Sequence, residues 1–260
     1  VAREPFSIQA RSTCWCCRLV KVSLITVCFN ACDTLQDTIN SVEAQTCDEI
    51  EYIVVDGGST DGTQQIISSN TSTITKWISE PDQGLYDAMN KGISLSTGEI
   101  IGFINADDVL NDQYCVESVR QSFLNSDADI VYGNKVYCDP KDLSVVTRIW
   151  NPGEFSTEKY RRGWMPPHLS TYVRASVYEE YGGYRTDFKI AADYELLLRI
   201  FLKAKLKSQY VDLTIARMRT GGISNSSVRN IAVSNWEVYK SWKLNGLSVN
   251  PLIMLWKPYR

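Results

Sequence analysis

The sequence lacks both an apolar run long enough to cross a membrane and an excess of positive charge. A membrane-spanning helix needs about 20 consecutive apolar residues, and the apolar run at 249–256 is too short. A net formal charge of −3 and a pI of about 5.4 disfavour nucleic-acid binding, because nucleic-acid-binding domains carry a basic field. An acidic protein that binds a diphosphate would need a local device: a helix N-terminus, a few basic side chains or a metal ion.

The sequence also lacks a signal peptide and a zinc-type cysteine pattern. Residues 1–20 show neither helical nor strand periodicity, and basic residues interrupt any apolar core that a signal peptide would need. We therefore expect 1–20 to be an irregular leader, either disordered or foreign to the domain. Of the eight cysteines, Cys14 and Cys17 form a lone C-x-x-C with no second pair and no histidine nearby. Buried or free thiols are therefore expected.

A regular alternation of strand-like and helix-like segments begins at Lys21. The strand-like runs are at 21–29, 49–56, 72–80, 99–105 and 128–137. The helix-like segments between them are at 31–45, 60–69, 84–96 and 112–124. The less regular second half has expected strands at 145–155, 168–174 and 207–219 and expected helices at 175–183, 192–205 and 228–246. This order predicts an α/β fold with a mostly parallel, Rossmann-like sheet and helices on both faces.

Polar signatures follow the expected strands at their carboxyl ends, where ligands bind in sheets of this kind. The second strand ends at Asp56 and enters a glycine-rich turn. An ordinary capped turn explains 58–63 but not the carboxylate of Asp56, which could accept hydrogen bonds from a base or a ribose. Asp82 follows the third strand, and a capped helix start explains it equally well. The stretch 54–63 matches neither G-x-G-x-x-G nor a P-loop.

The fourth strand ends in the sequence Asn105-Ala106-Asp107-Asp108. A turn is the simplest interpretation, because Asn and Asp favour turns. Two adjacent carboxylates repel each other and raise each other's pKa, however, and a divalent cation removes the repulsion. Carboxylate oxygens suit Mg²⁺ or Mn²⁺, and Mg²⁺ commonly takes one or two carboxylates together with substrate phosphates. The stretch therefore predicts a metal–diphosphate site.

The second half contributes three further candidates. Asp193 and Glu195 lie in the first turn of the helix expected at 192–205, where acids complement the helix dipole. Asp193 could instead be a general base above the ligand crevice, whereas Glu195 fits the dipole role better. His168, the only histidine, follows two prolines at the start of an expected strand. A lone histidine is more often structural, but this position keeps a functional role open.

Six segments taken together resemble the inverting nucleotide-sugar glycosyltransferases of family 2, which have the GT-A fold. The segments are 22–46, 51–63, 79–93, 98–108, 182–199 and 221–224. Their order and spacing match as well, and the similarity runs from about Lys21 to Ser224. It is strongest to the bacterial polysaccharide and O-antigen branch of that family.

The resemblance implies a role for each matching residue. Asp193 would deprotonate the acceptor hydroxyl, and Asp56 would contact the nucleotide base. Asp107 and Asp108 would hold Mg²⁺ or Mn²⁺ against the diphosphate. The nucleotide-sugar pocket would comprise Val27, Asn30, Asp56, Asp82 and Asp107.

Two positions depart from the family pattern. The D-x-D-type motif has Asn105 at its first position, so the metal loses one carboxylate and Asp107 and Asp108 must do more. The usual acidic doublet after the second strand is Asp56-Gly57 here, which leaves one carboxylate.

An organisation and a set of partners follow. We expect a catalytic domain at 21–225, with the nucleotide-sugar-binding half at 21–110 and the acceptor-binding half at 111–225. The helical tail at 226–260 is basic and aromatic, which suits either a membrane surface or packing on the domain. We expect a cytoplasmic enzyme at the inner face of the cell membrane, with a UDP-sugar donor and a glycan or undecaprenyl-type lipid-linked acceptor. The alternative is a non-catalytic nucleotide-sugar or glycan-binding module of the same fold.

Overall fold

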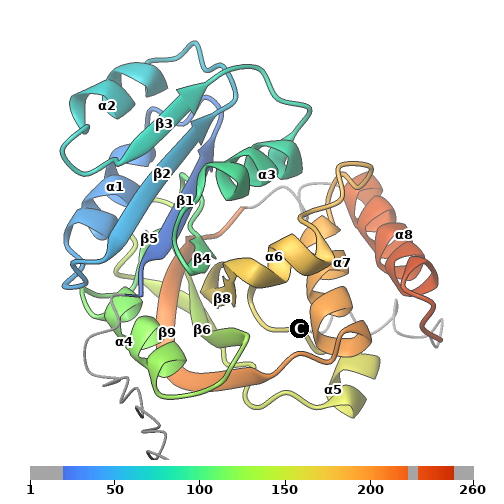
Figure 1. The fold of residues 1–260 in the computed structure, drawn as a ribbon. Helices are drawn as coiled ribbons and strands as arrows, with labels where there is room; N and C mark the ends of the chain where they lie inside the picture. The colour runs from blue at the N-terminus through green and yellow to red at the C-terminus, as the bar shows by residue number, and fades with distance from the viewer. Residues whose placement is uncertain (1–19, 222–227, 249–260) are drawn as a thin grey trace, which may run out of the picture.

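The computed structural model describes residues 20–221 and 228–248, which contain a nine-stranded sheet (Figure 1). The strands lie side by side in the order β3-β2-β1-β4-β8-β6-β9-β5, and β7 pairs with β6. The strands are β1 Val22–Cys28, β2 Ile50–Asp56, β3 Lys76–Ser79, β4 Ile100–Phe103, β5 Val109–Leu110, β6 Ile130–Cys138, β7 Val146–Trp150, β8 Thr171–Arg174 and β9 Ser208–Arg219. The α-helices are α1 Leu35–Glu43, α2 Thr63–Ser69, α3 Leu85–Leu95, α4 Cys115–Leu124, α5 Thr157–Arg161, α6 Ala175–Tyr181, α7 Ala192–Leu198 and α8 Val228–Leu244.

Most of the strands share one direction. β1 pairs parallel with β2 and β4, and β2 pairs parallel with β3. β8 runs antiparallel to both β4 and β6, so β4 and β6 point the same way, and β9 is parallel to β6. The short β5 and the hairpin strand β7 run in the opposite direction. The expected mostly parallel α/β sheet is therefore confirmed, with antiparallel strands confined to its second half.

Helices cover both faces of the parallel part of the sheet. The chain moves from β1 to β2 to β3 in one direction across the sheet and then returns past β1 to β4. Right-handed crossovers therefore place α1 and α2 on one face and α3 on the other, as Figure 1 shows. Gly92 lets α3 lie close to β1, since a Cβ at this position would lie 2.5 Å from Ile25.

The expected elements of the described chain are present, with shorter ends. The helix expected at 31–45 occupies Leu35–Glu43, and the strand expected at 72–80 occupies Lys76–Ser79. β5 and α5 were not predicted from the sequence, because at two and five residues they are too short to show a strand or helix periodicity. Nor were the 3₁₀ turn at His168–Ser170 and the π-helical turn at Arg199–Lys203 that continues α7.

The tail helix α8 packs against α7 on one side and is exposed on the other (Figure 1). Trp242 is only 1% exposed, and its indole N–H donates to the hydroxyl of Tyr194 at 2.9 Å. Trp236 is 63% exposed. The packing interpretation of the tail is therefore confirmed for Trp242. The expected basic and aromatic residues of 249–260 and the leader at 1–19 lie outside the described residues.

Two expectations about composition can be checked in the described chain. Cys28, Cys32, Cys47, Cys115 and Cys138 are free thiols, and all but Cys32 are buried. Cys14, Cys16 and Cys17 lie outside the described residues. Within 20–221 and 228–248, none of the helices has the length and apolar character needed to cross a membrane.

Candidate active site

The carboxyl ends of β1, β2 and β3 lie level with one another at one edge of the sheet. Register pairs Cys28 with Asp56 and Asp56 with Ser79. β4 lies on the other side of β1, so the direction in which the chain crosses the sheet reverses between these two strands. Ligands of open α/β sheets bind at such a reversal. A ligand-binding site is therefore expected at the loops after β1, β2, β3 and β4.

Asp56 is fully buried at the end of β2, and both of its carboxylate oxygens are occupied. The hydroxyl and the backbone N–H of Ser59 donate to them, the latter at 3.0 Å. The hydroxyl of Ser79 donates at 2.6 Å, and the thiol of Cys28 lies 3.7 Å away. Asp56 therefore ties the ends of three strands to the loop after β2. Its expected contact with a nucleotide base stays a prediction.

Asn30 joins the loop after β1 to the loop after β2. It has a left-handed backbone, with φ of 50°. Its backbone N–H donates to the hydroxyl of Ser59 at 2.7 Å, and its side-chain oxygen accepts from the N–H of Thr60 at 3.0 Å. The preceding Phe29 is 64% exposed and offers an aromatic face that the sequence reading did not pick out. Val27, two residues before Phe29 in β1, is buried in the core at 6% exposure.

Asp82 lies against the turn that follows Asp56. Its carboxylate accepts from the backbone N–H of Gly84 at 2.8 Å, which places it at the start of α3. A Cβ on Gly57 would lie 2.5 Å from the other carboxylate oxygen and 3.4 Å from the ring of Phe29. The absence of a side chain at Gly57 therefore provides the space that the Asp82 carboxylate occupies. Asp82, Gly57 and Phe29 therefore lie together at one corner of the candidate site, and the expected contact of Asp82 with a nucleotide stays a prediction.

The two acids after β4 have opposite environments. Asp107 is exposed, whereas the side chain of Asp108 is fully buried. One oxygen of Asp108 accepts from the backbone N–H of Arg219 at 3.0 Å, and the other accepts from the amide of Asn105 at 3.2 Å. Burial, and then the neighbouring charge of Asp107, raise the pKa of Asp108 to about 7. Asp107 is therefore open to a ligand, whereas Asp108 is held by hydrogen bonds within the protein.

Arg219, at the end of β9, holds the Asn105–Asp108 turn in place. Its guanidinium donates to the carbonyl of Asp107 at 2.5 Å and to the carboxylate of Asp37 at 2.6 Å. Only 12% of its side chain is exposed. The sequence reading missed this residue because 111 positions separate it from Asp108, and no local pattern links the two.

Asp193 lies at the start of α7, partly exposed, where it was expected. The hydroxyl of Tyr86, on α3, lies 3.3 Å from its carboxylate and 2.7 Å from the carbonyl of Ile190. Burial, and then the charge of Asp193, raise the pKa of this tyrosine, which therefore stays protonated and can donate. Glu237 of α8 accepts from the backbone N–H groups of 189, 190 and 191 at 2.7 to 2.9 Å, which fixes the segment that leads into α7.

Glu195 and His168 are held within the protein. Glu195 is buried and forms a salt bridge of 2.9 Å with Arg199, whose guanidinium also donates to carbonyl groups at 181–183. His168 stacks on Phe103 at 5.6 Å between ring centroids, and its Nε2 lies 2.6 Å from the hydroxyl of Tyr184. Burial lowers the pKa of His168, and the charge of Asp193 opposes that effect. The described contacts of both residues are structural, and their suggested roles toward a ligand stay predictions.

Lys135 is a further charged residue that the sequence reading missed. It lies in β6 at 6% exposure. Its ammonium lies 3.1 Å from the sulfur of Met218 and within 4.5 to 5.0 Å of the ring centroids of Tyr137 and Trp150. Burial lowers its pKa to about 8, and the charges of Asp108 and Asp193 both oppose that effect. Lys135 therefore lies in the electrostatic field of both acids. A lysine within a largely apolar strand was the available signal.

A divalent cation fits this site only together with a phosphate-bearing substrate. Among the described residues, no group of three or more His, Cys, Asp and Glu side chains could hold a metal. Asp107 offers an exposed carboxylate, whereas the oxygens of Asp108 already accept hydrogen bonds. Mg²⁺ commonly takes one or two carboxylates and completes its shell with substrate phosphates. The residues present therefore fit a cation that binds with a diphosphate.

Solved structures with a similar fold are glycosyltransferases. Residues 1–349 of TarS from S. aureus, in complex with UDP-GlcNAc, match with a TM-score of 0.68 and 15% identity over 90% of this chain and 69% of that one. The mannosyltransferase PcManGT from Pyrobaculum calidifontis, in complex with GDP-Man and Mn²⁺, matches with a TM-score of 0.65 and 16% identity over 92% of this chain and 69% of that one. At these identities the similarity establishes the GT-A fold.

Sequence relatives extend the similarity to the family. An uncharacterised glycosyltransferase of Mycobacterium tuberculosis is 36% identical over 184 residues, which is 70% of this chain and 69% of the relative. A PGL/p-HBAD biosynthesis glycosyltransferase of Mycobacterium bovis is 28% identical over 212 residues, 79% of this chain and 80% of the relative. Residues 23–180 match the family described as glycosyl transferase family 2. The protein is therefore an enzyme of glycosyl transferase family 2, with the GT-A fold.

Proposed function

We propose that this glycosyltransferase is metal-dependent and inverting, and that it moves a sugar from a UDP-sugar to a hydroxyl of a glycan or lipid-linked acceptor. The observation that carries the proposal is the contact between the helix that follows Asp82 and the helix that bears Asp193. Asp82 accepts from the backbone N–H of Gly84 at the start of α3, and two residues later the hydroxyl of Tyr86 lies 3.3 Å from the Asp193 carboxylate. This contact supports a single site in which the loops after the parallel strands and an acid suited to general base catalysis lie together.

The base in this proposal is Asp193. The acceptor oxygen forms a bond to the anomeric carbon while the bond from that carbon to the diphosphate oxygen breaks, and the acceptor proton passes to the carboxylate of Asp193. A single displacement inverts the configuration of the sugar. Tyr86 is a positioning residue: its hydroxyl lies 3.3 Å from the Asp193 carboxylate and can hold one oxygen in place.

The donor would lie along the loops after β1 to β4. Phe29, Asn30 and Asp82 would contact the nucleoside, and Asp56 would hold these loops together through Ser59 and Ser79. Asp107, with Asp108 behind it, would hold Mg²⁺ or Mn²⁺ against the diphosphate. When bound, that ion neutralises the charge that develops on the leaving UDP.

The function can be tested by donor turnover in the Asp193→Asn variant. The wild-type chain, supplied with UDP-sugars, Mn²⁺ and membrane lipids, should release UDP. Asp193→Asn should bind UDP with an unchanged Kd and lose about 10² to 10⁴ of its transfer rate. Asp48→Asn, an exposed acid before β2, is the matched control and should behave as wild type. Normal transfer by Asp193→Asn would show that the base is another residue, and a chain that binds UDP but never turns over would favour the non-catalytic module.

The exposed face of α8 is proposed to bring the enzyme to an anionic membrane surface, where a lipid-linked acceptor would lie. Trp236 is 63% exposed and packs on Tyr239 at 5.8 Å between ring centroids. Lys243 lies 5.6 Å from the Tyr239 ring. An exposed tryptophan on a partly exposed tyrosine, beside a cation, is a composition that suits the lipid–water interface.

A point substitution tests the membrane contact better than removal of the tail, because α8 also carries the buried residues Glu237 and Trp242. Trp236→Ala should reduce flotation with vesicles that contain phosphatidylglycerol. Trp77→Ala, at a β3 tryptophan that is 39% exposed, is the matched control. Equal flotation of both variants and the wild type would contradict a role for this face.

A further inference from the structure

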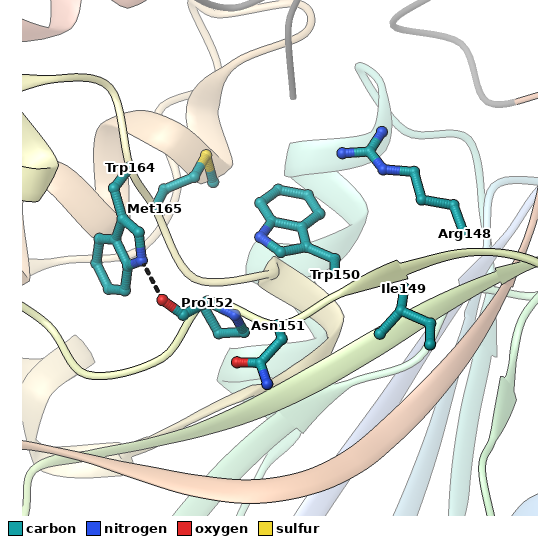
Figure 2. Close-up of a pocket in the computed structure, with 7 residues that line it drawn as sticks. All are labelled: Arg148, Ile149, Trp150, Asn151, Pro152, Trp164 and Met165. Carbon is teal, nitrogen blue, oxygen red and sulfur yellow. Dashed lines mark hydrogen bonds between the residues drawn. The ribbon is translucent and has the colours of Figure 1, made fainter.

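A cavity of about 230 Å³ opens between β7 and the segment that follows it (Figure 2). Trp150, Trp164 and Met165 give it flat and apolar walls, and Arg148 stands beside them. The indole N–H of Trp164 donates to the carbonyl of Pro152 at 2.6 Å, which fixes this ring. No aspartate or glutamate is among the residues that line the cavity. The nucleotide-binding loops do not contribute to it, so the site described above leaves it unassigned.

The cavity lies on the face of the β6–β7 hairpin that carries Lys135. Register places Trp150 opposite Lys135 and Arg148 opposite Tyr137, so these four side chains share one face of the hairpin. The rings of Tyr137 and Trp150 are stacked at 6.5 Å with an angle of 7° between their planes. The ammonium of Lys135 lies 5.0 Å from the Trp150 ring centroid. A molecule on Trp150 would therefore be next to Lys135. The opposite wall of the cavity leads to the proposed base, because Trp164 lies 5.7 Å from Tyr160 between ring centroids, and Tyr160 lies 6.0 Å from Tyr194, the residue after Asp193.

The two cations favour an anion at this face. The guanidinium of Arg148 lies over the ring of Tyr137 at 5.1 Å. A guanidinium that stacks on a ring keeps the N–H groups at its edge available for hydrogen bonds. Arg148 is exposed and forms no salt bridge within the part of the chain that the structure describes. Arginine pairs with phosphate through two parallel N–H···O bonds, and the aromatic walls match the apolar C–H face of a sugar ring.

We propose that this cavity is the acceptor subsite, and that it takes a sugar phosphate. The sugar ring lies on Trp150 between Trp164 and Met165, and the phosphate is bound by Arg148. This inference rests on the proposed transferase function, because it identifies the molecule whose hydroxyl faces Asp193. The phosphate belongs either to the linkage of a lipid-borne sugar or to a phosphate substituent of a glycan.

Binding can be measured without any turnover, so the test is separate from that of the catalytic proposal. The probes are glucose 1-phosphate and methyl glucoside, added to the ¹⁵N-labelled full chain while the indole N–H signals are followed by NMR. The Trp150→Phe variant assigns the signal of Trp150. We expect glucose 1-phosphate to shift this signal and to bind about tenfold more tightly than methyl glucoside, as a hydrogen-bonded charge contact provides.

Single substitutions separate the contacts. Arg148→Ala should remove the preference for the phosphate, and Trp150→Ala should weaken both probes. Arg229→Ala, at an exposed arginine of α8, is the matched control and should leave both affinities unchanged. Asp193→Asn should also bind normally, so a failure of the base assignment would not affect this result.

Other outcomes would overturn the proposal. Displacement of glucose 1-phosphate by UDP would place the probe in the donor site, and equal affinities for the two probes would remove the role of Arg148. Tighter binding of glucuronic acid than of glucose 1-phosphate would assign a carboxylate instead.

A short isoprenyl phosphate-linked sugar distinguishes the two sources of the phosphate. Tighter binding of this probe than of glucose 1-phosphate supports a membrane-borne acceptor, and equal binding supports a phosphorylated glycan.

Discussion

At the scale of single residues, Asn105 stabilises the acidic turn after β4 in the absence of a cation. Its side-chain amide donates to Asp108 at 3.2 Å, and the backbone of Arg219 donates to the other oxygen at 3.0 Å. These neutral donors partly offset the repulsion from Asp107 and the cost of burial. A carboxylate at position 105 would remove one donor and add a third negative charge.

We therefore predict opposite effects of Asn105→Asp with and without metal. In EDTA the variant should lose about 1 to 3 kcal/mol of unfolding free energy, because a buried hydrogen bond is replaced by a like-charge contact. With UDP, the Mn²⁺ concentration that half-saturates thermal stabilisation should fall. Asn125→Asp, at the exposed end of α4, is the matched control. The same Mn²⁺ response in both variants would show that position 105 does not face the ion.

The candidate acids could be named from the sequence, whereas other residues around them could not. Asp56, Asp82 and Asp107 could be named because each is a carboxylate that follows an apolar strand. Tyr86, Lys135 and Arg219 could not be assigned, since their partners come from elements that are 83 to 112 positions away in the chain. A pattern read along the chain contains no register between such distant elements.

At the scale of elements, α8 positions the helix that bears Asp193. The Glu237 carboxylate accepts three backbone N–H groups at 189–191, and Trp242 packs beneath it on Tyr194. These N–H groups precede α7 and have no helical partner, as is usual at a helix start. The helix α8, which the sequence suggested as a candidate membrane-binding segment, therefore also supports the position of Asp193.

We predict that Glu237→Ala lowers both stability and kcat. Loss of the acceptor leaves the buried N–H group of Ala191 unsatisfied, at a cost of about 1 to 3 kcal/mol, and also removes two part-buried hydrogen bonds. The displaced start of α7 should lower kcat for transfer more than it changes the Kd for UDP, because the proposed UDP site is formed by the loops after β1 to β4. Thermal unfolding and steady-state kinetics measure the two effects, and Glu43→Ala on α1 is the matched control. A loss of stability with unchanged kcat would limit Glu237 to a structural role.

At the scale of the whole molecule, the first half of the fold was more predictable than the second. β1 and β4 are buried along their whole lengths and β2 is buried from its second residue on, so apolar runs revealed them. In the second half, β8 inserts between β4 and β6, pairing Ile101 with Val173 and Ile130 with Val173. Such an insertion depends on contacts between distant segments, and the alternation of strands and helices does not encode it.

The two ends of the parallel sheet have different tasks, and Glu51 shows this most clearly. It lies at the start of β2, at the end opposite to the active site, with only 4% of its side chain exposed. It accepts hydrogen bonds from Ser23 at 2.6 Å, from the backbone and hydroxyl of Thr97 at 2.7 and 2.8 Å, and from Lys76 at 2.8 Å. Burial alone would raise its pKa, but the bonds from Lys76, Ser23 and Thr97 lower it to about 2.

A carboxyl group with a lowered pKa in the folded state stabilises the protein above its unfolded pKa of about 4.5. That stabilisation is lost as the pH falls toward 2. We predict that Glu51→Gln lowers the unfolding free energy by about 2 to 3 kcal/mol at pH 7, and that the difference from wild type shrinks between pH 5 and pH 2. Urea unfolding across this pH range measures it. The Kd for UDP at pH 7 should not change, because the contacts of Glu51 are all at the other end of β1, β2 and β3. A difference that is constant with pH would mean that Glu51 acts through packing and not through its charge.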